Sequence, residues 1–217
     1  MTLPVDRGSP VGSSKGPEKQ PDFVLRNIGE LVTNDPALGE GALGLVRGAA
    51  VAVRGGAVVW VGRDRDLPPD LTPSETSKIA DAGGRAVVPG LVDCHTHVVY
   101  AGDRVSDFDL RLSGLSYAEI AARGGGILTT VEKTRAAGED GLCAESLPRL
   151  RNMLRHGVTT AEVKSGYGLD LESEVKQLSA IDAVSRRPGV PSLVATYLAL
   201  HALPPEANGD RDAYAAN

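Results

Sequence analysis

The sequence predicts an α/β fold in which a parallel sheet is covered by crossover helices and a smaller β-rich segment precedes it. From residue 86 onward, apolar β-branched stretches alternate with stretches of helical periodicity. The expected strands are almost continuously apolar, which is typical of strands covered on both faces. The preceding segment consists of short valine-rich runs separated by turn residues. We expect either an α/β barrel or a doubly wound open sheet.

Composition restricts the classes of protein and partner. The 217 residues, 41% of them hydrophobic, suffice for one sizeable core or for one domain and part of another. With 23 basic and 28 acidic residues the formal net charge is -5, so the basic excess typical of nucleic-acid binding is missing. No apolar stretch approaches the roughly 20 residues that span a membrane. The two cysteines, Cys94 and Cys143, form no disulfide framework, which favours a reducing, cytoplasmic setting.

The first part of the chain is expected to hold a tail and a small β domain. Residues 1–21 are rich in proline and glycine and poor in apolar side chains, which predicts a disordered tail and not a signal peptide. Residues 22–85 are expected to form the β domain, in which Gly55 and Gly56 separate two valine-rich runs as a hairpin turn does. A proline-rich connector, "DLPPDLTPSETS", lies near its end.

The α/β part begins with "RAVVPGLVDCHTHVVYAG", which we interpret as a buried first strand. Residues 140–156 are expected to form a helix that ends at Gly157, with Pro148 either kinking it or marking its true first turn. One face of this helix would carry Cys143, Leu147, Leu150 and Leu154.

The pattern then repeats. "GVTTAEVK" predicts a second strand and "PSLVATYLAL" a third. Between them, residues 170–187 predict a helix. The face that this helix buries would carry Leu171, Val175, Leu178 and Ile181.

Unusual polar residues follow the ends of these strands, where the active site of an α/β barrel lies. His95 and His97 follow the first strand, Tyr167 the second and His201 the third. Residues two apart in a strand point to the same face, so the two neighbouring imidazoles can share one divalent metal ion. The alternative is a pair of hydrogen-bonded histidines at a strand end.

Other side chains near this edge have competing interpretations. Cys94 would face away from the two histidines, Cys143 is expected in the core, and His156 would complement a helix dipole. Glu162 and Lys164 alternate on one strand face and are expected to form an internal ion pair.

Three further candidates surround the histidine pair. Arg104 is suited to bind a substrate carboxylate, or else pairs at the surface with Asp103 or Asp107. Tyr167, in "KSGYG", faces the same rim or is an exposed ring in a tight turn. His201 is a metal ligand, a proton carrier or a substrate contact.

These residues stand in motifs that resemble a known family. "PGLVDCHTH" followed by "AGDR" is similar to the first barrel strand of the metal-dependent amidohydrolases. "ARGGGILTTVEKTRAA", "GVTTAEVKSGYGLDLESEVKQL" and "LALHALPPE" are similar to the imidazolonepropionase family in particular, and are far more specific than the histidine pair. The likeness runs from about Asp22 to Asn217.

The resemblance implies a small β domain beside a (β/α)₈ barrel, whose first part would be residues 86–217. It implies a hydrolase that opens the cyclic amide 4-imidazolone-5-propionate to N-formimidoyl-L-glutamate in histidine degradation, through water activated by a metal. His95 and His97 would hold one zinc or iron ion. The substrate would be contacted by Arg104, Tyr167 and His201. A homodimer of the full-length protein is compatible with the resemblance.

A (β/α)₈ barrel takes roughly 250 residues, which is more than this part of the chain provides. We therefore expect the chain to be the amino-terminal half of such a protein, with the remaining metal ligands and the acid-base residues on later strands. Alone, it is expected to be poorly folded and to show no turnover, because an open half-barrel exposes strand edges and apolar faces. The alternatives are another amidohydrolase, acting on cyclic amides or as a deaminase, and a non-catalytic remnant.

Overall fold

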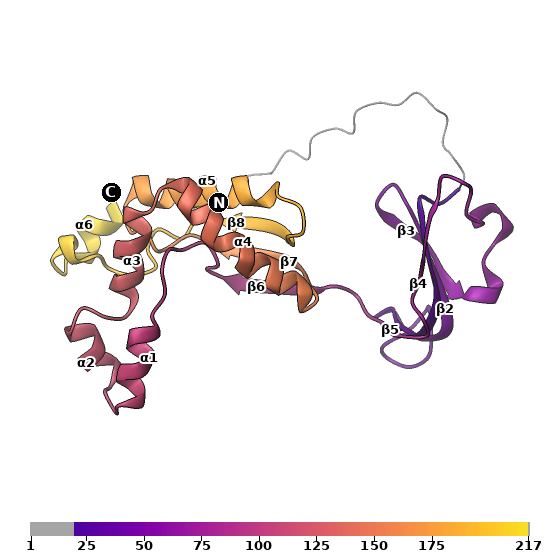
Figure 1. Ribbon diagram of the computed structural model, residues 1–217, viewed down its shortest axis with the longest axis horizontal. Helices are drawn as coiled ribbons and strands as arrows, with labels where there is room; N and C mark the ends of the chain where they lie inside the picture. The colour runs from indigo at the N-terminus through magenta and orange to yellow at the C-terminus, as the bar shows by residue number, and fades with distance from the viewer. Residues whose placement is uncertain (1–19, 217) are drawn as a thin grey trace, which may run out of the picture. The chain divides into compact units, whose positions relative to one another are not determined.

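The computed structural model describes residues 20–216, so the tail expected for residues 1–21 lies almost entirely outside the described residues. The chain divides into two compact units, one ending at Pro89 and the other beginning at Gly90 (Figure 1). Within residues 20–216, no helix is long and apolar enough to cross a membrane.

The first unit is a five-stranded sheet with two short 3₁₀ helices. Its strands follow the order β3-β2-β1-β4, and β5 also pairs with β1. The pairs β1/β2 and β2/β3 are antiparallel, whereas β4 and β5 run parallel to β1. The elements are β1 Phe23–Val32, β2 Leu45–Arg54, β3 Ala57–Arg63, η1 Asp64–Asp66, η2 Pro69–Leu71, β4 Lys78–Asp81 and β5 Ala86–Val87.

The hairpin predicted around Gly55 and Gly56 is confirmed, because it joins β2 to β3. Both glycines have positive φ angles, +56° and +78°, as a two-residue hairpin turn of type I′ requires. The buried side chains of this unit are apolar. They include Val24, Ile28, Leu31, Val46, Ala49, Ala50 and Ala52.

The second unit is a three-stranded parallel sheet with crossover helices, so the predicted alternation of strands and helices is confirmed. The strand order is β6-β7-β8, and no closed barrel is present in residues 20–216. Its strands are β6 Leu91–Thr96, β7 Val158–Lys164 and β8 Ser192–Thr196. Its helices are α1 Val105–Leu112, α2 Tyr117–Ala122, α3 Ile127–Ala136, α4 Glu139–Arg155, α5 Leu171–Ser185, η3 Pro205–Ala207 and α6 Arg211–Ala216.

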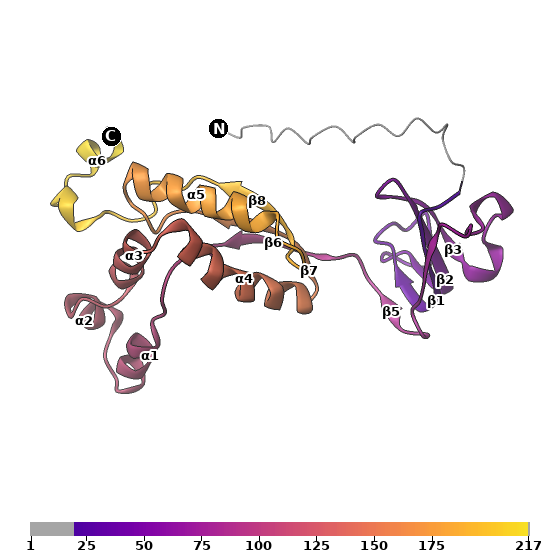
Figure 2. The same cartoon turned by 45° about the horizontal axis from the view of Figure 1, so that its top comes forward.

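Helices α4 and α5 lie side by side along this sheet (Figure 2). Together with β7 they form one apolar core, in which the middle strand contributes the fully buried Ala161 and Val163. Val99, which follows β6, belongs to the same core. The core therefore fixes the positions at which β6 and β7 end.

The buried first strand expected from the sequence is wrong. Ala86–Val87 pairs with β1 in the first sheet, and only Leu91–Thr96 joins the second sheet. There it is an edge strand, and 67% of Val92 is exposed. Apolar composition alone does not say how many faces of a strand are covered, because coverage depends on elements that are distant in sequence.

Two expectations about helices are also corrected. Pro148 lies inside α4, which begins at Glu139, so it does not mark the first turn. In α5, Leu171 and Val175 are 66% and 48% exposed, whereas Leu178 packs against the core and Ile181 is buried, so only the second half of the predicted apolar face is buried. The buried side chains of α5 are Ser173, Glu174, Gln177, Ala180, Ile181 and Val184. The helix is rotated so that two long polar side chains reach the loops at the strand ends.

Candidate active site

The two histidines of the His-x-His pair lie at the carboxyl end of β6. His95 is inside the strand and His97 is the first residue after it. Their rings lie 5.7 Å apart between centroids and are inclined at 64°. His95 is exposed, whereas His97 is partly buried. The alternation of the strand thus brings both imidazoles to one edge of the sheet.

Residues that follow β7 and β8 meet His97 there. The Tyr167 ring lies 5.2 Å from the His97 ring, and the His201 ring lies 4.5 Å from it. Tyr167 and His201 are 5.7 Å apart. Gly166 permits this approach: its φ is +116°, and a Cβ atom there would lie 2.9 Å from the His201 Cβ. The structure therefore gathers residues from three strand ends around one imidazole.

The His97 ring has no hydrogen-bond partner at either nitrogen, although both atoms are buried. Buried imidazole nitrogens are normally paired, whereas the backbone of Ser165 acts on the pKa of this ring without meeting the geometry of a hydrogen bond. Burial lowers the pKa of His97, and the nearby His201 lowers it further, while the backbone of Ser165 opposes the shift. The neutral form that results is the form in which an imidazole binds a metal ion.

Arg104 lines a cavity of about 710 Å³ together with His97, Tyr100, Phe108 and Tyr167. The expected alternative, a surface ion pair, is absent from the described residues, because both neighbouring carboxylates accept backbone N–H groups instead. Burial raises the pKa of Tyr167, and the positive charge of Arg104 opposes this shift. A cation and a phenol therefore face the same cavity as His97.

Glu162 and Lys164 form the internal ion pair expected from the sequence, with 2.5 Å between the carboxylate and the ammonium group. Thr196 also donates a hydrogen bond to Glu162, at 2.6 Å. The hydrogen bond from Lys164 and, after it, the one from Thr196 lower the pKa of Glu162. Lys164 is thereby committed to a carboxylate inside the unit.

Cys94, Cys143 and His156 lie in surroundings that give them no part in the candidate site. Cys94 is exposed, and Cys143 packs against the core with its Sγ 3.6 Å from the carbonyl oxygen of Ala180. His156 caps the end of α4, where its Nδ1 lies 2.8 Å from the Asn152 carbonyl oxygen.

The described residues do not form a complete metal site. A catalytic zinc site usually has three protein ligands. Within residues 20–216, no group of three or more histidine, cysteine, aspartate or glutamate side chains could hold a metal ion. The unpartnered ring of His97 beside His95 nevertheless suits an ion that accepts imidazole ligands. The imidazoles of His95 and His97 are therefore suited to bind a metal ion, but they are fewer ligands than a catalytic metal site usually has.

Buried and half-buried polar residues near the site were missed from the sequence. Arg149 of α4 donates hydrogen bonds to the carbonyl oxygens of Val98 and Tyr100, and its guanidinium lies 3.8 Å from the centre of the Tyr100 ring. Glu174 and Gln177 of α5 bind the loop that carries Tyr167. Their position in an otherwise ordinary amphipathic stretch gave no local signal of this role.

Comparison with known proteins shows similarity to imidazolonepropionases, although no protein-family model matches the chain. It is 49% identical over 172 residues to the imidazolonepropionase of Bradyrhizobium diazoefficiens, covering 79% of this chain and 42% of that protein. It is 47% identical over 190 residues to the one of Paracoccus denitrificans, covering 88% and 46%. The one of Chloroflexus aggregans is 48% identical over 199 residues, covering 89% and 46%. The chain thus spans less than half the length of the curated relatives that it matches.

Among solved structures, a triazine hydrolase variant matches with a TM-score of 0.52 at 16% identity. The match covers 81% of this chain and 35% of that one. At this identity the likeness concerns the fold alone. It indicates that the mixed α/β fold of this chain matches part of a larger structure.

Proposed function

We propose, on the premise that this chain is homologous to the amino-terminal part of imidazolonepropionases, that it carries the metal-binding and substrate-binding edge of such an enzyme. The reaction is the hydrolysis of 4-imidazolone-5-propionate to N-formimidoyl-L-glutamate in the cytoplasm. Strands β6, β7 and β8 are the first three strands of a (β/α)₈ barrel in this proposal. The observation that carries it is the unpartnered His97 ring among His95, Tyr167 and His201.

His95 and His97 would hold one zinc or iron ion, which when bound activates water for hydrolysis. Burial keeps His97 neutral and thus able to bind an ion. Two imidazoles are an incomplete set, so further ligands would come from the part of the longer relatives that this chain does not match. The same part would supply the groups that transfer protons.

Arg104 would bind the propionate carboxylate of the substrate, because a guanidinium can donate two parallel hydrogen bonds to a carboxylate. Its place beside the cavity of about 710 Å³, close enough to Tyr167 to oppose the rise in the pKa of that phenol, supports this role. Tyr167 and His201 would orient the imidazolone ring, since their rings lie 5.7 Å apart next to His97. Arg104 would then hold the charged end of the substrate, and the rings of Tyr167 and His201 would contact its imidazolone ring.

The test is a chimera in which residues 20–216 replace the matching part of the Paracoccus denitrificans imidazolonepropionase. We expect the chimera to form N-formimidoyl-L-glutamate. His97→Ala should abolish the reaction and reduce the bound metal, whereas the matched variant His156→Ala, at the end of α4, should change neither. Arg104→Ala should chiefly raise KM, because it removes a contact to the part of the substrate that does not react.

Three outcomes would contradict the proposal. Release of ammonia from a nitrogen heterocycle, without opening of the imidazolone ring, would indicate a deaminase. A folded chimera with full metal content but no hydrolysis would indicate a non-catalytic remnant. Unchanged metal content in His97→Ala would refute the ligand assignment.

A further inference from the structure

Gln177 of α5 joins the two loops on which the candidate site is built. It is fully buried. Its Oε1 accepts a hydrogen bond from the Tyr167 backbone N–H at 3.1 Å, and its Nε2 donates to the Val99 carbonyl oxygen at 2.8 Å. Val99 follows β6 and Tyr167 follows β7. A single side-chain amide therefore links the segment after His97 to the loop that carries Tyr167.

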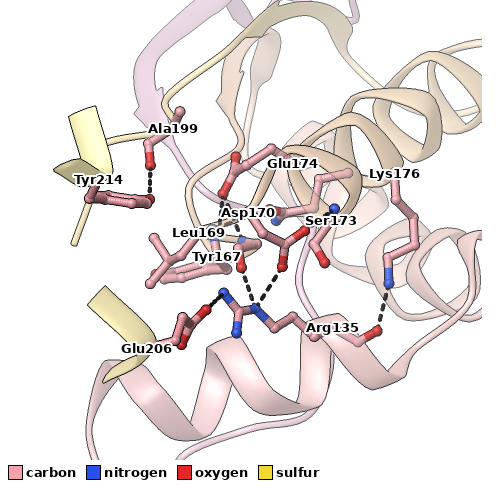
Figure 3. A network of polar contacts seen from close by, with 12 residues as sticks. Arg135, Tyr167, Leu169, Asp170, Ser173, Glu174, Lys176, Ala199, Glu206 and Tyr214 are labelled. Carbon is pink, nitrogen blue, oxygen red and sulfur yellow. Dashed lines mark hydrogen bonds and ion pairs between the residues drawn. The ribbon is translucent and has the colours of Figure 1, made fainter. Parts of the chain in front are cut away.

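Glu174, one helical turn earlier, holds the rest of that loop. The residue is 1% exposed, and its carboxylate, which Figure 3 shows beside the loop of Tyr167 and Leu169, accepts three backbone N–H groups. The donors are Gly166, Gly168 and Leu169, at 2.7, 2.8 and 2.7 Å. Hydrogen bonds to an ionised acceptor are about twice as strong as neutral ones. Three of them to one buried carboxylate fix the backbone on both sides of Tyr167.

The outer side of the same loop is held by a second helix. Arg135 of α3 donates from its Nε to the Gly168 carbonyl oxygen at 2.5 Å, and it forms ion pairs with Asp170 and Glu206 (Figure 3). The contacts of Arg135 are partly exposed, whereas those of Glu174 and Gln177 are buried. Solvent therefore screens the hydrogen bonds of Glu174 and Gln177 less than the contacts of Arg135, so the two buried side chains contribute more to the position of the loop.

We infer that Glu174 and Gln177 are positioning residues, which set the distance between the Tyr167 ring and the His97 ring by holding their loops on one helix. This deepens the proposed function and rests on it, because the distance matters to catalysis only if both rings line the active site. Neither side chain contacts those rings in the hydrogen bonds described above. Glu174 and Gln177 act through the backbone of the loops, to which they reach from the buried face of α5.

The experiment uses the histidines as reporters, since the chain has four of them. In the 217-residue chain, carbon-13 labelling of histidine gives imidazole signals from His95, His97, His156 and His201. The variants are Glu174→Gln and Gln177→Leu. The matched control is Glu172→Gln, an exposed carboxylate on the same helix. Amide hydrogen exchange of residues 166–169 is measured on the same samples.

In both variants we expect the His97 and His201 signals to shift, because the Tyr167 ring beside them moves. The His156 signal and the helical circular dichroism should stay unchanged. Exchange of the loop amides should accelerate roughly tenfold or more in Glu174→Gln, which loses charged acceptors. Glu174→Asp should return the signals part of the way, since it restores the carboxylate, and Glu172→Gln should match the parent.

Several results would overturn the inference. If the loop amides exchange faster while the His97 and His201 signals stay in place, the hydrogen bonds of Glu174 and Gln177 do not set the ring positions. If neither measurement changes, these hydrogen bonds do not hold the loops. If Glu174→Gln unfolds, Gln177→Leu decides by the same criteria, and unfolding of both assigns the pair to overall stability. None of these measurements needs substrate or metal, so failure of the proposed function is seen separately, in the chimera.

Discussion

The two units of the chain have different interiors. In the first unit the buried side chains are apolar. Within residues 20–216, every buried polar or charged side chain lies in the second unit. These are Thr130, Thr134, Ser146, Ser165, Ser173, Glu174 and Gln177. The unit with the candidate site is thus the one that buries hydrogen-bonding groups.

The difference follows from how the backbone hydrogen-bonding groups of each unit are satisfied. In the first unit neighbouring strands satisfy each other's backbone, and the hairpin joins β2 and β3 locally. In the second unit each strand ends in a loop whose backbone groups have no strand partner. Buried side chains from the helices satisfy these groups, as Thr134 does for the Ala101 N–H and Gln177 for the Tyr167 N–H. A site built on loops therefore requires polar side chains in the core.

The largest expected effect comes from emptying the two apolar cores. Ile28 and Ile181 are both 1% exposed, one in each unit. Changing either to alanine should lower the free energy of unfolding by about 2–5 kcal/mol, because a cavity remains. Leu171→Ala, at an exposed position of α5, should change it by less than about 0.5 kcal/mol. Urea titrations measure this, with Trp60 fluorescence reporting on the first unit and helical circular dichroism on the second.

An equal loss in Leu171→Ala and Ile181→Ala would contradict the observed orientation of α5. These losses can be measured only if the parent chain unfolds cooperatively, which the apolar core of each unit leads us to expect, contrary to the sequence-based expectation that the chain is poorly folded on its own. A sharp transition in the helical signal of the parent chain would contradict that expectation.

A medium effect should come from removing a buried polar group from the second unit and adding one to the apolar core of the first. Thr134→Val leaves the buried Ala101 N–H without its acceptor, which should lower the stability of the second unit by about 1–3 kcal/mol. Val24→Thr puts an extra hydroxyl into the apolar core of the first unit, with a loss of about 1–3 kcal/mol. Both changes keep the side-chain shape, and the urea titrations measure both. If either is neutral, the contrast between the interiors is not energetic.

The smallest effect concerns pH and the outer side of the loop after β7. The hydrogen bond from Arg135 lowers the pKa of Glu206 below its usual 4.5. A carboxylate with a lowered pKa adds stability above the usual pKa, and this is lost as the pH falls through the lowered value. Because Glu206 is 55% exposed, Glu206→Gln should reduce stability near neutral pH by at most about 1 kcal/mol.

The comparison is made by circular dichroism, with Glu172→Gln as the control. Well below pH 4.5 the parent and Glu206→Gln should unfold together. A difference that persists there would mean that Glu206 acts by packing and not by charge.

Much of the fold could be predicted from local pattern. The hairpin at Gly55 and Gly56 was predictable because a two-residue turn needs positive φ angles, which glycine adopts freely. After residue 90, the order β6, α4, β7, α5, β8 was predictable from the change of hydrophobic period, whereas α1, α2, α3 and α6 were not predicted. The coverage of β6, an edge strand in which 67% of Val92 is exposed, was not predictable, since it depends on elements that are distant in sequence.

The candidate site divides in the same way. His95, His97, Tyr167 and His201 were found because they follow apolar strands, and the ends of parallel strands meet at one edge. Their roles as ligands or substrate contacts stay predictions. Glu174 and Gln177 were not found, because a helix with apolar residues at Leu171, Val175, Leu178 and Ile181 suggests a different buried face.

The sequence by itself determined the kinds of element, their order and the chemistry placed at each strand end, because periodicity and turn residues act over short distances. Only the tertiary structure decided which face of α5 is buried and which imidazole is left without a partner. The physical reason is that backbone groups in loops must be satisfied by whatever side chain lies nearest in space. At the loop after β7 this requirement outweighed the burial of Leu171 and Val175 and turned Glu174 and Gln177 inward.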